Sequence, residues 1–309
     1  MTKKHKNSYH WFLIALLAAF MAAPNGTIIK HTSTEISPFI FNGLRFGLMA
    51  IICSPYIFAA RKRITFRNLK ATFIVGFFMF SAVMSYVIAI QASQASYVSI
   101  ITLLTPVVFV ILSLKLTGES VSRRAVAGIT LAALGAFIIV AFPIAFQQGA
   151  SFRFYPLATF FALCNVITFP LAIIYSKKAN DQGLPLTAIL GISAWAIFVS
   201  TMLISVLLGS WSGTSFSSIS IMGIIYSGVI VAFLARIMGV ASYEHLGSPV
   251  ISGLSYVETL LAIVLPVIIL GEQLSIEMVV GGALILLGVY FVEHHKSAHH
   301  KHYQLFKTH

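Results

Sequence analysis

Ten long apolar segments constrain the fold of this chain more than any other feature of its sequence. A bilayer core is about 30 Å thick, so a helix needs roughly 20 mostly apolar residues to cross it. The predicted spans are residues 11–29, 37–60, 71–90, 95–114, 124–142, 154–175, 185–208, 218–240, 248–270 and 275–292. Their residues do not alternate as those of membrane-barrel strands do, and the links between them are too short for a soluble domain. The sequence therefore predicts an all-α integral membrane protein with ten transmembrane helices.

The composition excludes a water-soluble protein. Hydrophobic residues make up 58% of the chain and charged residues only 9%, whereas a soluble domain carries about a quarter charged residues. Twenty Lys and Arg against eight Asp and Glu would suggest nucleic-acid binding in a soluble protein. Here most basic residues lie in the links, where they face anionic lipid headgroups. We therefore expect the lipid bilayer, and no nucleic acid, as a partner.

The distribution of the basic residues predicts the orientation. With the N-terminus in the cytoplasm, sixteen Lys and Arg fall on the cytoplasmic side, while only Lys30 and Arg153 fall on the other. The sixteen are Lys3, Lys4, Lys6, Arg61, Lys62, Arg63, Arg67, Lys70, Lys115, Arg123, Arg124, Lys177, Lys178, Lys296, Lys301 and Lys307. Because cytoplasmic loops carry an excess of Lys and Arg, we expect a multi-pass protein with both termini in the cytoplasm, in the inner membrane if the source is bacterial.

An internal repeat appears when the chain is compared with itself at an offset of 153 residues. Residues 118–135 then match residues 271–288 with eight identities in eighteen columns, including the Gly-Glu pair that opens each segment. The matched turn joins the fourth and fifth spans in one half and the ninth and tenth in the other. Because five is odd, the second half enters the membrane from the opposite side.

The repeat predicts the domain organisation and a class of function. We expect a cytoplasmic segment over residues 1–10, five-helix repeats over 11–146 and 154–292, and a His/Lys-rich cytoplasmic tail over 293–309. Two halves of inverted topology are typical of secondary transporters, because exchanging their conformations opens the protein to the other side. A duplication that only built a stable bundle is the alternative.

Several motifs resemble one family. In the first half they are Leu104-Thr105-Pro106 and Leu116-Thr117-Gly118-Glu119, and in the second Tyr256-Val257-Glu258 and Leu270-Gly271-Glu272. Their order and spacing resemble the EamA type of the drug/metabolite transporter superfamily. The resemblance implies a ten-helix carrier of small metabolites, often an exporter of amino acids or related compounds. It also implies a central cavity lined by spans one, three, four, six, eight and nine.

Three strongly ionisable residues lie clearly within the spans, away from their ends: Arg45, Arg236 and Glu258. An arginine at the bilayer centre costs roughly 2.5–3.5 kcal/mol, so such groups face the bundle interior or water and need partners. Glu258 is a candidate proton carrier or counter-charge for an ammonium group; the alternative is a structural partner for an arginine. Arg236 either extends to the cytoplasmic surface or clamps a carboxylate or phosphate.

Arg45 lies in the second span between Gly43 and Gly47. These small residues let a neighbouring helix approach closely, and the guanidinium could then bond freed carbonyl groups. The resembled family carries this arginine whatever the substrate. We therefore predict a structural or gating role for Arg45.

Prolines interrupt two spans, Pro24 in the first and Pro170 in the sixth. Proline frees a backbone carbonyl, and paired helix breaks in two halves point to a binding site. Asn25 and Asn165 lie beside these breaks and are candidate substrate contacts, as are Tyr97 and Tyr256. The alternative is that the prolines only kink their helices for packing and that the tyrosine rings only pack against neighbouring helices.

The sequence favours transport over catalysis. A membrane enzyme would need a constellation such as paired carboxylates or His with Asp, and away from their ends the spans hold a single glutamate, Glu258. No glycine-rich phosphate loop with lysine is present, so we expect no ATP-driven step, no cofactor and no metal, the last despite the histidine-rich tail. The prediction is a secondary transporter that moves a small polar, amino-acid-like metabolite by alternating access, as an exporter, with protons as the candidate coupling ion. A membrane-embedded enzyme or a passive membrane scaffold is the alternative.

Overall fold

The computed structural model describes the backbone of residues 3–105, 107–108, 111–112, 123–145, 155–246 and 248–305. Side chains are described over 9–105, 107–108, 111–112, 126–139, 155–239, 241–242 and 257–291. This part of the chain is helical and contains no strand. The all-α membrane fold predicted from the sequence is therefore confirmed.

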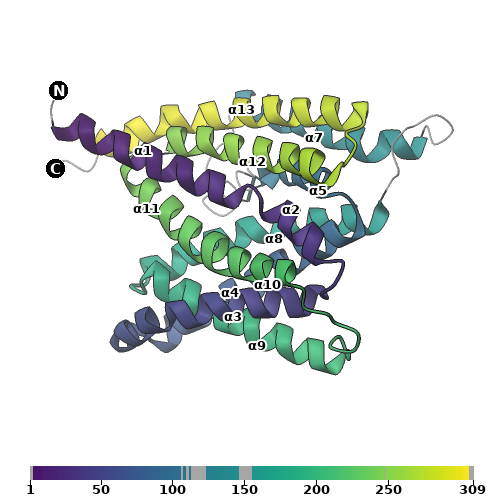
Figure 1. Ribbon diagram of the computed structural model, residues 1–309. Helices are drawn as coiled ribbons and strands as arrows, with labels where there is room; N and C mark the ends of the chain where they lie inside the picture. The colour runs from purple at the N-terminus through teal and green to yellow at the C-terminus, as the bar shows by residue number, and fades with distance from the viewer. Residues whose placement is uncertain are drawn as a thin grey trace.

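The helices follow one another in a simple order (Figure 1). They are α1 (Lys3–Ala22), α2 (Asn25–Thr32), α3 (Pro38–Ala59), the 3-10 turn η1 (Arg61–Arg63), α4 (Phe66–Ala92), α5 (Ala95–Thr102), α7 (Arg123–Ala145), α8 (Pro156–Asp181), α9 (Leu186–Leu207), α10 (Ser218–Ile225), the π-helix η2 (Tyr226–Ala235), α11 (Arg236–Leu246), α12 (Ser248–Leu270) and α13 (Ile276–Leu305).

Local sequence signals set several helix boundaries. The Ser37 hydroxyl accepts a hydrogen bond from the Ile40 amide at 3.4 Å before α3 begins at Pro38. Thr65 and Asn68 form a reciprocal capping box at the start of α4, which satisfies amides that have no partner inside the helix. Gly271 ends α12 with a φ of +68°, a conformation that glycine adopts without steric cost.

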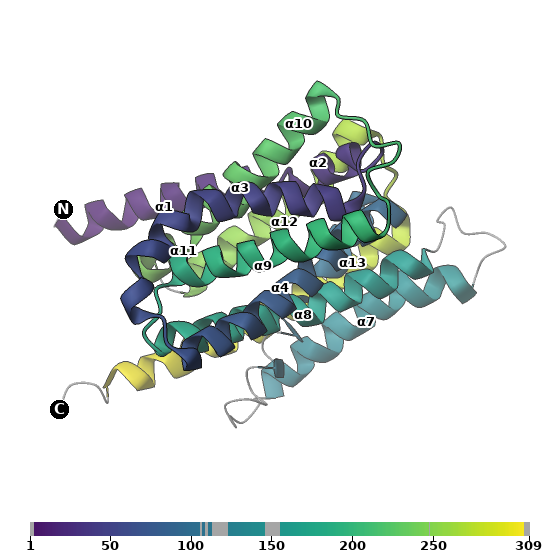
Figure 2. The ribbon, with the colours of Figure 1, turned by 90° about the horizontal axis from the view of Figure 1, so that it is seen from below.

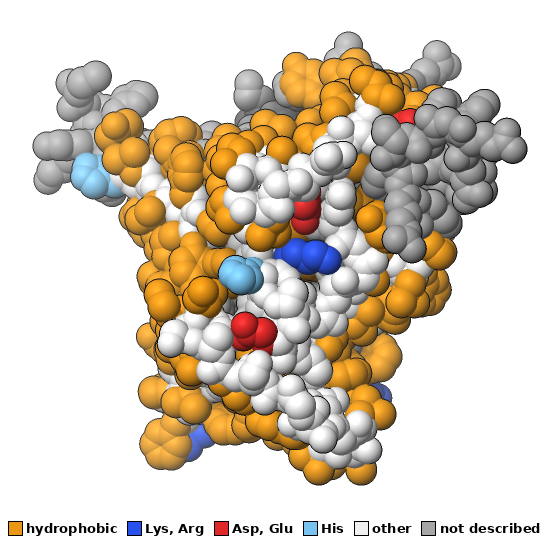
Figure 3. Space-filling model, turned by 45° about the vertical axis from the view of Figure 1, so that its right-hand side comes forward, with side chains coloured by type: hydrophobic (Ala, Val, Ile, Leu, Met, Phe, Trp, Pro, Cys, Tyr) orange, Lys and Arg blue, Asp and Glu red, His pale blue; other side chains and the backbone are white. Residues whose placement is uncertain are grey.

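Among the described residues, six helices are long and apolar enough to cross a membrane, namely Tyr9–Thr32, Pro38–Ala59, Phe66–Ala92, Pro156–Asp181, Leu186–Leu207 and Ser218–Gly239. Val126–Ile139, Val257–Leu270 and Ile276–Phe291 are shorter apolar helices. Large hydrophobic side chains are exposed along the flanks (Figure 3), among them Phe73 and Leu207, each 74% exposed. The number of ten spans remains a prediction, because part of the fourth lies outside the described residues.

The helix pairs reflect the internal repeat. α3 packs against α9, α5 against α12, and α7 against α13, so second, fourth and fifth spans each meet their counterpart. Two further pairs are α4 with α8 and α1 with α11. Replacing each half by the other turns one of these two pairs into the other. Figures 1 and 2 show α7 beside α13 and α3 beside α9. The packing therefore has an approximate two-fold symmetry.

Glycine contacts between α7 and α13 show this symmetry at atomic detail. A Cβ built on Gly135 would lie 2.5 Å from the Gly281 carbonyl oxygen, and a Cβ built on Gly288 would lie 2.5 Å from that of Gly128. At the offset of 153 residues, Gly135 matches Gly288 and Gly128 matches Gly281. The two contacts are thus copies of each other. They also show that the two helices run antiparallel.

The two ends of the bundle differ in charge. The start of α1, the end of α13, η1 and the link from α8 to α9 lie at one end, here called the near end (Figures 1 and 2). It carries the basic residues of η1 together with Lys177 and Lys178. The opposite, far end carries the links at residues 33–37, 93–94, 208–217 and 271–275.

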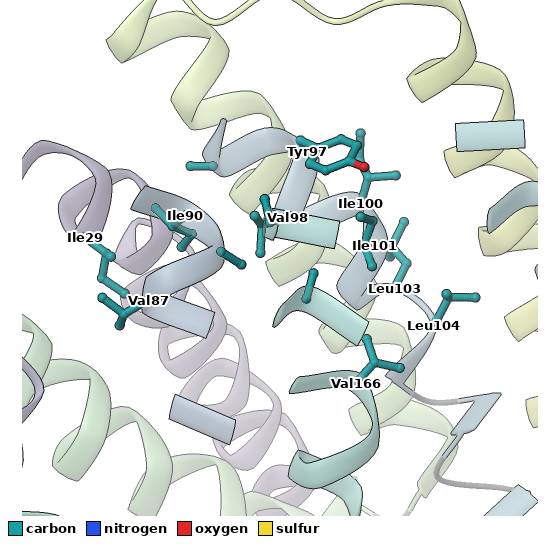
Figure 4. Packing of buried hydrophobic residues seen from close by; sticks show 14 of the residues in the cluster. Ile29, Val87, Ile90, Tyr97, Val98, Ile100, Ile101, Leu103, Leu104 and Val166 are labelled. Atoms are coloured by element: carbon teal, nitrogen blue, oxygen red, sulfur yellow. The ribbon is translucent and has the colours of Figure 1, made fainter. Parts of the chain in front are cut away.

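The largest buried cluster among the described residues joins both halves. Side chains of α2, α4, α5 and α8 meet in it (Figure 4), including Ile29, Ile90, Tyr97 and Val166, each no more than 1% exposed. This packing fixes the short helix α5 between α8 and α12.

We predict that alanine at either Gly135 or Gly288 destabilises the protein to a similar extent. The added methyl group would overlap backbone atoms of the neighbouring helix, and overpacking costs about 1–3 kcal/mol. Thermal unfolding in detergent measures the effect. Gly239→Ala is the matched control, because a Cβ there meets nothing within 4 Å. Equal melting temperatures for Gly135→Ala and the control would contradict the prediction.

Candidate functional site

Arg45, Arg236 and Glu258 come from three helices, α3, α11 and α12. Arg45 interacts electrostatically with Arg236, and Arg236 interacts with Glu258. The phenol of Tyr86 on α4 interacts with both Arg45 and Glu258. The structure thus brings the three predicted charges into one electrostatic group and adds Tyr86 to it.

Arg45 is buried, with 6% of its surface exposed. Its guanidinium carbon lies 4.8 Å from the centre of the Phe46 ring and 5.7 Å from that of Phe41. The sequence suggested that this guanidinium bonds freed carbonyl groups. In the structure its Nε and Nη1 atoms have no hydrogen-bond partner, and the rings of Phe41 and Phe46 lie against the guanidinium.

Arg236 directly follows the ten-residue π-helix η2. Its Nη2 contacts the Met79 sulfur at 3.9 Å, and its guanidinium lies 5.4 Å from the centre of the Phe169 ring. A Cβ built on Gly228 in η2 would lie 2.7 Å from the Arg45 carbonyl oxygen, so glycine lets η2 approach α3. π-Helical segments are rare and often occur at functional sites.

Pro24 lies in a break between α1 and α2, as the sequence predicted. The Tyr226 hydroxyl donates to the Met21 carbonyl oxygen at 2.9 Å, which lies one turn before the break. The Ser227 hydroxyl donates to the Asn25 side-chain oxygen at 3.1 Å. The break in the first span is therefore bonded to the π-helix of the eighth.

Pro170 does not break its helix. α8 continues through it from Pro156 to Asp181, because membrane helices tolerate proline where neighbouring groups satisfy the freed backbone. Asn165, one turn earlier, donates from Nδ2 to the Ala82 carbonyl oxygen at 2.9 Å. This bond ties α8 to α4, so Asn165 has a packing contact in this structure.

Of the two tyrosines selected as candidate substrate contacts, the structure describes the side chain of one. Tyr97 is fully buried, and its hydroxyl shares a hydrogen bond of 2.6 Å with Thr159 on α8. Its ring centre lies 5.9 Å from that of Tyr155. Tyr97 therefore contributes to the contact between α5 and α8. The side chain of Tyr256 lies outside the described residues.

Glu272 joins the two halves at the far end. Its carboxylate accepts hydrogen bonds from the Ala95 amide at 2.8 Å, the Ser96 amide at 2.9 Å and the Ser96 hydroxyl at 2.6 Å. These donors are the first residues of α5, where unpaired amides and the helix dipole favour a negative charge. A residue of the second half thus caps a helix of the first.

Lys30 lies beside this contact and interacts electrostatically with Glu272. Its ammonium donates to the carbonyl oxygens of Ile90 at 3.1 Å and Gln91 at 3.3 Å, and also to that of Ser93. These carbonyl groups lie at the C-terminal end of α4, where the helix dipole favours a positive charge. Lys30 and Glu272 therefore hold the end of α4 and the start of α5 together.

Glu35 makes the reverse connection, from the first half to the second. Its Oε2 accepts from the Ser220 hydroxyl at 2.5 Å and from the Ser217 amide at 3.4 Å, at the start of α10. Hydrogen bonds from Ser220 and Ser217 lower the pKa of Glu35. The carboxylate therefore stays charged at neutral pH, and the contact is lost only as the pH falls through this lowered pKa. Figure 3 shows acidic, basic and histidine side chains gathered in the middle of the face it presents.

Sequence reasoning did not select Tyr86, Lys30, Glu35 or Glu272 as site residues. The recurrence of Gly-Glu at 118–119 and 271–272 was a signal for Glu272, whereas its partners lie 176 and 177 residues away. The turn at 118–119 lies outside the described residues. Among the described side chains, no group of three or more His, Cys, Asp and Glu could hold a metal ion.

Comparison with known proteins connects this arrangement to a family. The EamA-like transporter family matches residues 10–141 and 156–293. The uncharacterized transporter YetK of Bacillus subtilis (strain 168) is 26% identical over 156 residues, which cover 48% of this chain and 46% of YetK. The match thus spans about half the length of that curated relative.

A solved crystal structure of another protein has a similar fold, with a TM-score of 0.61 and 17% sequence identity. The alignment covers 92% of this chain and 96% of the other. Because the family match extends over both halves, the chain belongs to the EamA-like transporter family.

Proposed function

We propose that this chain is a secondary transporter that exports a small polar, amino-acid-like metabolite across the cytoplasmic membrane by alternating access. The observation that carries the proposal is the group formed by Arg45, Arg236, Glu258 and Tyr86, which lies among helices of both halves. Charged residues within membrane spans mark substrate and ion pathways in membrane proteins. Transport requires no nucleotide.

The far-end contacts support alternating access. Glu272 connects the second half to α5, and Glu35 connects the first half to α10. Both contacts cross between the halves, so both must break when the halves separate at this end. We assign the far end to the outside, because the near end carries the basic residues of η1 and α8 that cytoplasmic surfaces favour.

Protons are the proposed coupling ion, and Glu258 is the proposed proton carrier. Its carboxyl group interacts electrostatically with Arg236 and with Tyr86. A group that can exchange its proton with alternate sides of the membrane can couple transport to a pH gradient.

Purified protein in liposomes should exchange labelled amino-acid-like solutes between the two sides without ATP. Counterflow from a preloaded interior measures this, with protein-free liposomes as the control. A requirement for ATP, or ion currents of channel size, would show that the protein is not a secondary transporter.

Glu272→Gln should open the far end more often. The amide cannot supply the charge that the α5 amides bind, and hydrogen bonds to charged groups contribute about 1.5–3 kcal/mol. The reporter is Ser99→Cys, in a chain without Cys53 and Cys164, because Ser99 is 2% exposed and lies one turn below Ser96. We expect labelling by an external, membrane-impermeant thiol reagent to rise about tenfold, which corresponds to roughly 1.4 kcal/mol.

Two further variants sharpen this test. Ser96→Ala removes one of the three hydrogen bonds to Glu272 and should give a smaller increase. Gln273→Ala changes the exposed neighbour and should give none. If Glu272→Gln labels Ser99→Cys no faster than Gln273→Ala does, the far-end contact is not a gate.

Glu258→Gln should abolish accumulation driven by a pH gradient while leaving exchange between equal pools largely intact, because the amide cannot carry a proton. Both fluxes are measured with the same liposome preparation. Normal gradient-driven accumulation by a well-folded variant would exclude the role as proton carrier. If Glu258 were instead a structural partner of an arginine, its loss would lower the melting temperature, at a cost of roughly 3–5 kcal/mol.

A further inference from the structure

The group formed by Arg45, Arg236, Glu258 and Tyr86, here called the charged interior, carries more positive than negative charge. Among the described side chains it contains two guanidinium groups, Arg45 and Arg236, and one carboxyl group, Glu258. If Glu258 is ionised, the surplus is one positive charge; if it is protonated, the surplus is two. The sign of the surplus therefore does not depend on the protonation state of Glu258.

Arg45 has unused hydrogen-bonding capacity. It is 6% exposed, yet its Nε and Nη1 atoms have no partner. Leaving a buried donor unsatisfied costs about 1–3 kcal/mol, and more when the group is charged. The rings of Phe41 and Phe46 lie against the guanidinium but do not satisfy these donors. These two donors of Arg45 are therefore available to an acceptor.

The contacts that the structure describes for Arg236 include no strong hydrogen-bond acceptor. Its contacts among the described side chains are the Met79 sulfur at 3.9 Å and the Phe169 ring at 5.4 Å. A thioether is a weak acceptor, whereas a guanidinium presents five N–H groups in a planar fork that matches a carboxylate. Glu258 influences Arg236 electrostatically, but it makes no hydrogen bond to the guanidinium.

The two arginines also repel each other. A negatively charged ligand reduces this repulsion, supplies acceptors for the free donors and lowers the net charge of the interior. A cationic ligand would add to the surplus. A neutral ligand would leave it unchanged.

We propose that the transported solute is an organic anion whose carboxylate is bound by Arg45 and Arg236, and that among amino-acid-like solutes the protein selects the acidic ones. This inference rests on the proposed function, since it names the substrate class of that site. Arg45 supplies Nε and Nη1, and Arg236 supplies the fork that now contacts Met79.

Glutamate and glutamine provide a direct test, because they have nearly the same shape and differ by one negative charge. The full-length protein is reconstituted into liposomes, and counterflow of labelled L-glutamate, L-glutamine, L-lysine and L-leucine is measured side by side. We expect glutamate to exchange at least tenfold faster than glutamine at equal concentration, with lysine slowest. Aspartate against asparagine repeats the comparison with a shorter side chain.

Variants assign the selectivity to the arginines. Arg236→Gln should reduce the preference for glutamate over glutamine at least tenfold, and Arg45→Lys should reduce it while keeping the charge, because lysine lacks the fork. Arg61→Gln at the exposed near end is the matched control and should keep the preference. Size-exclusion chromatography and the melting temperature establish that each variant is folded.

The outcomes separate this inference from the proposed function. Counterflow of glutamine, leucine or lysine that equals or exceeds that of glutamate would overturn the selectivity for anions and leave secondary transport standing. Failure of every tested solute to exchange would count against both. If the wild-type protein prefers glutamate and Arg236→Gln keeps this preference, the arginines do not bind the carboxylate and the site is wrongly assigned.

Discussion

The absence of water from the bilayer core is the constraint on which this structure depends, because every backbone polar group there needs a partner within the protein. Helices satisfy most of these groups internally, but breaks and ends remain. At the break after α1, Tyr226 bonds the Met21 carbonyl. At the junction of α4 and α5, Lys30 donates hydrogen bonds to the carbonyl groups that end α4, and Glu272 accepts hydrogen bonds from the amides that begin α5. Since the tyrosine and the glutamate come from the other half, satisfying the backbone also joins the two halves.

The same constraint explains the surroundings of the charged interior. Arg45 is held by aromatic rings of its own helix, while Gly228 lets the π-helix lie against its backbone. The π-helix ends directly before Arg236. It begins at Tyr226 and Ser227, whose hydroxyl groups donate hydrogen bonds to Met21 and Asn25 on either side of Pro24. One irregular segment thus connects the broken first span to an interior arginine. Irregular backbone at membrane depth occurs where it is buried in protein or lines a cavity.

The sequence predicted the helical membrane fold and the bounds of most of the described helices, because long apolar runs are a local pattern. The two five-helix repeats stay a prediction, which the recurring Gly-Glu pair supports. The sequence also selected the three interior charges, which are rare in such segments. It did not predict the partners of Glu272 or Lys30, because these depend on contacts between distant residues. It assigned a break to Pro170, where α8 continues, since composition does not reveal whether neighbours satisfy the freed carbonyl. Tyr97 was a cavity candidate, but its hydroxyl bonds Thr159.

The glycine contact between α7 and α13 has a consequence for how such a chain could arise. Gly135 meets Gly281 and Gly288 meets Gly128, so each copy of the motif uses the same two positions to touch the other copy. A contact of this kind is isologous: one surface is complementary to itself. A single five-helix half therefore carries all the residues that the contact needs, and two separate halves of opposite orientation could form it before any fusion. Divergence of the fused copies is then restricted at these glycines, since a larger side chain in one copy needs a compensating change in the other.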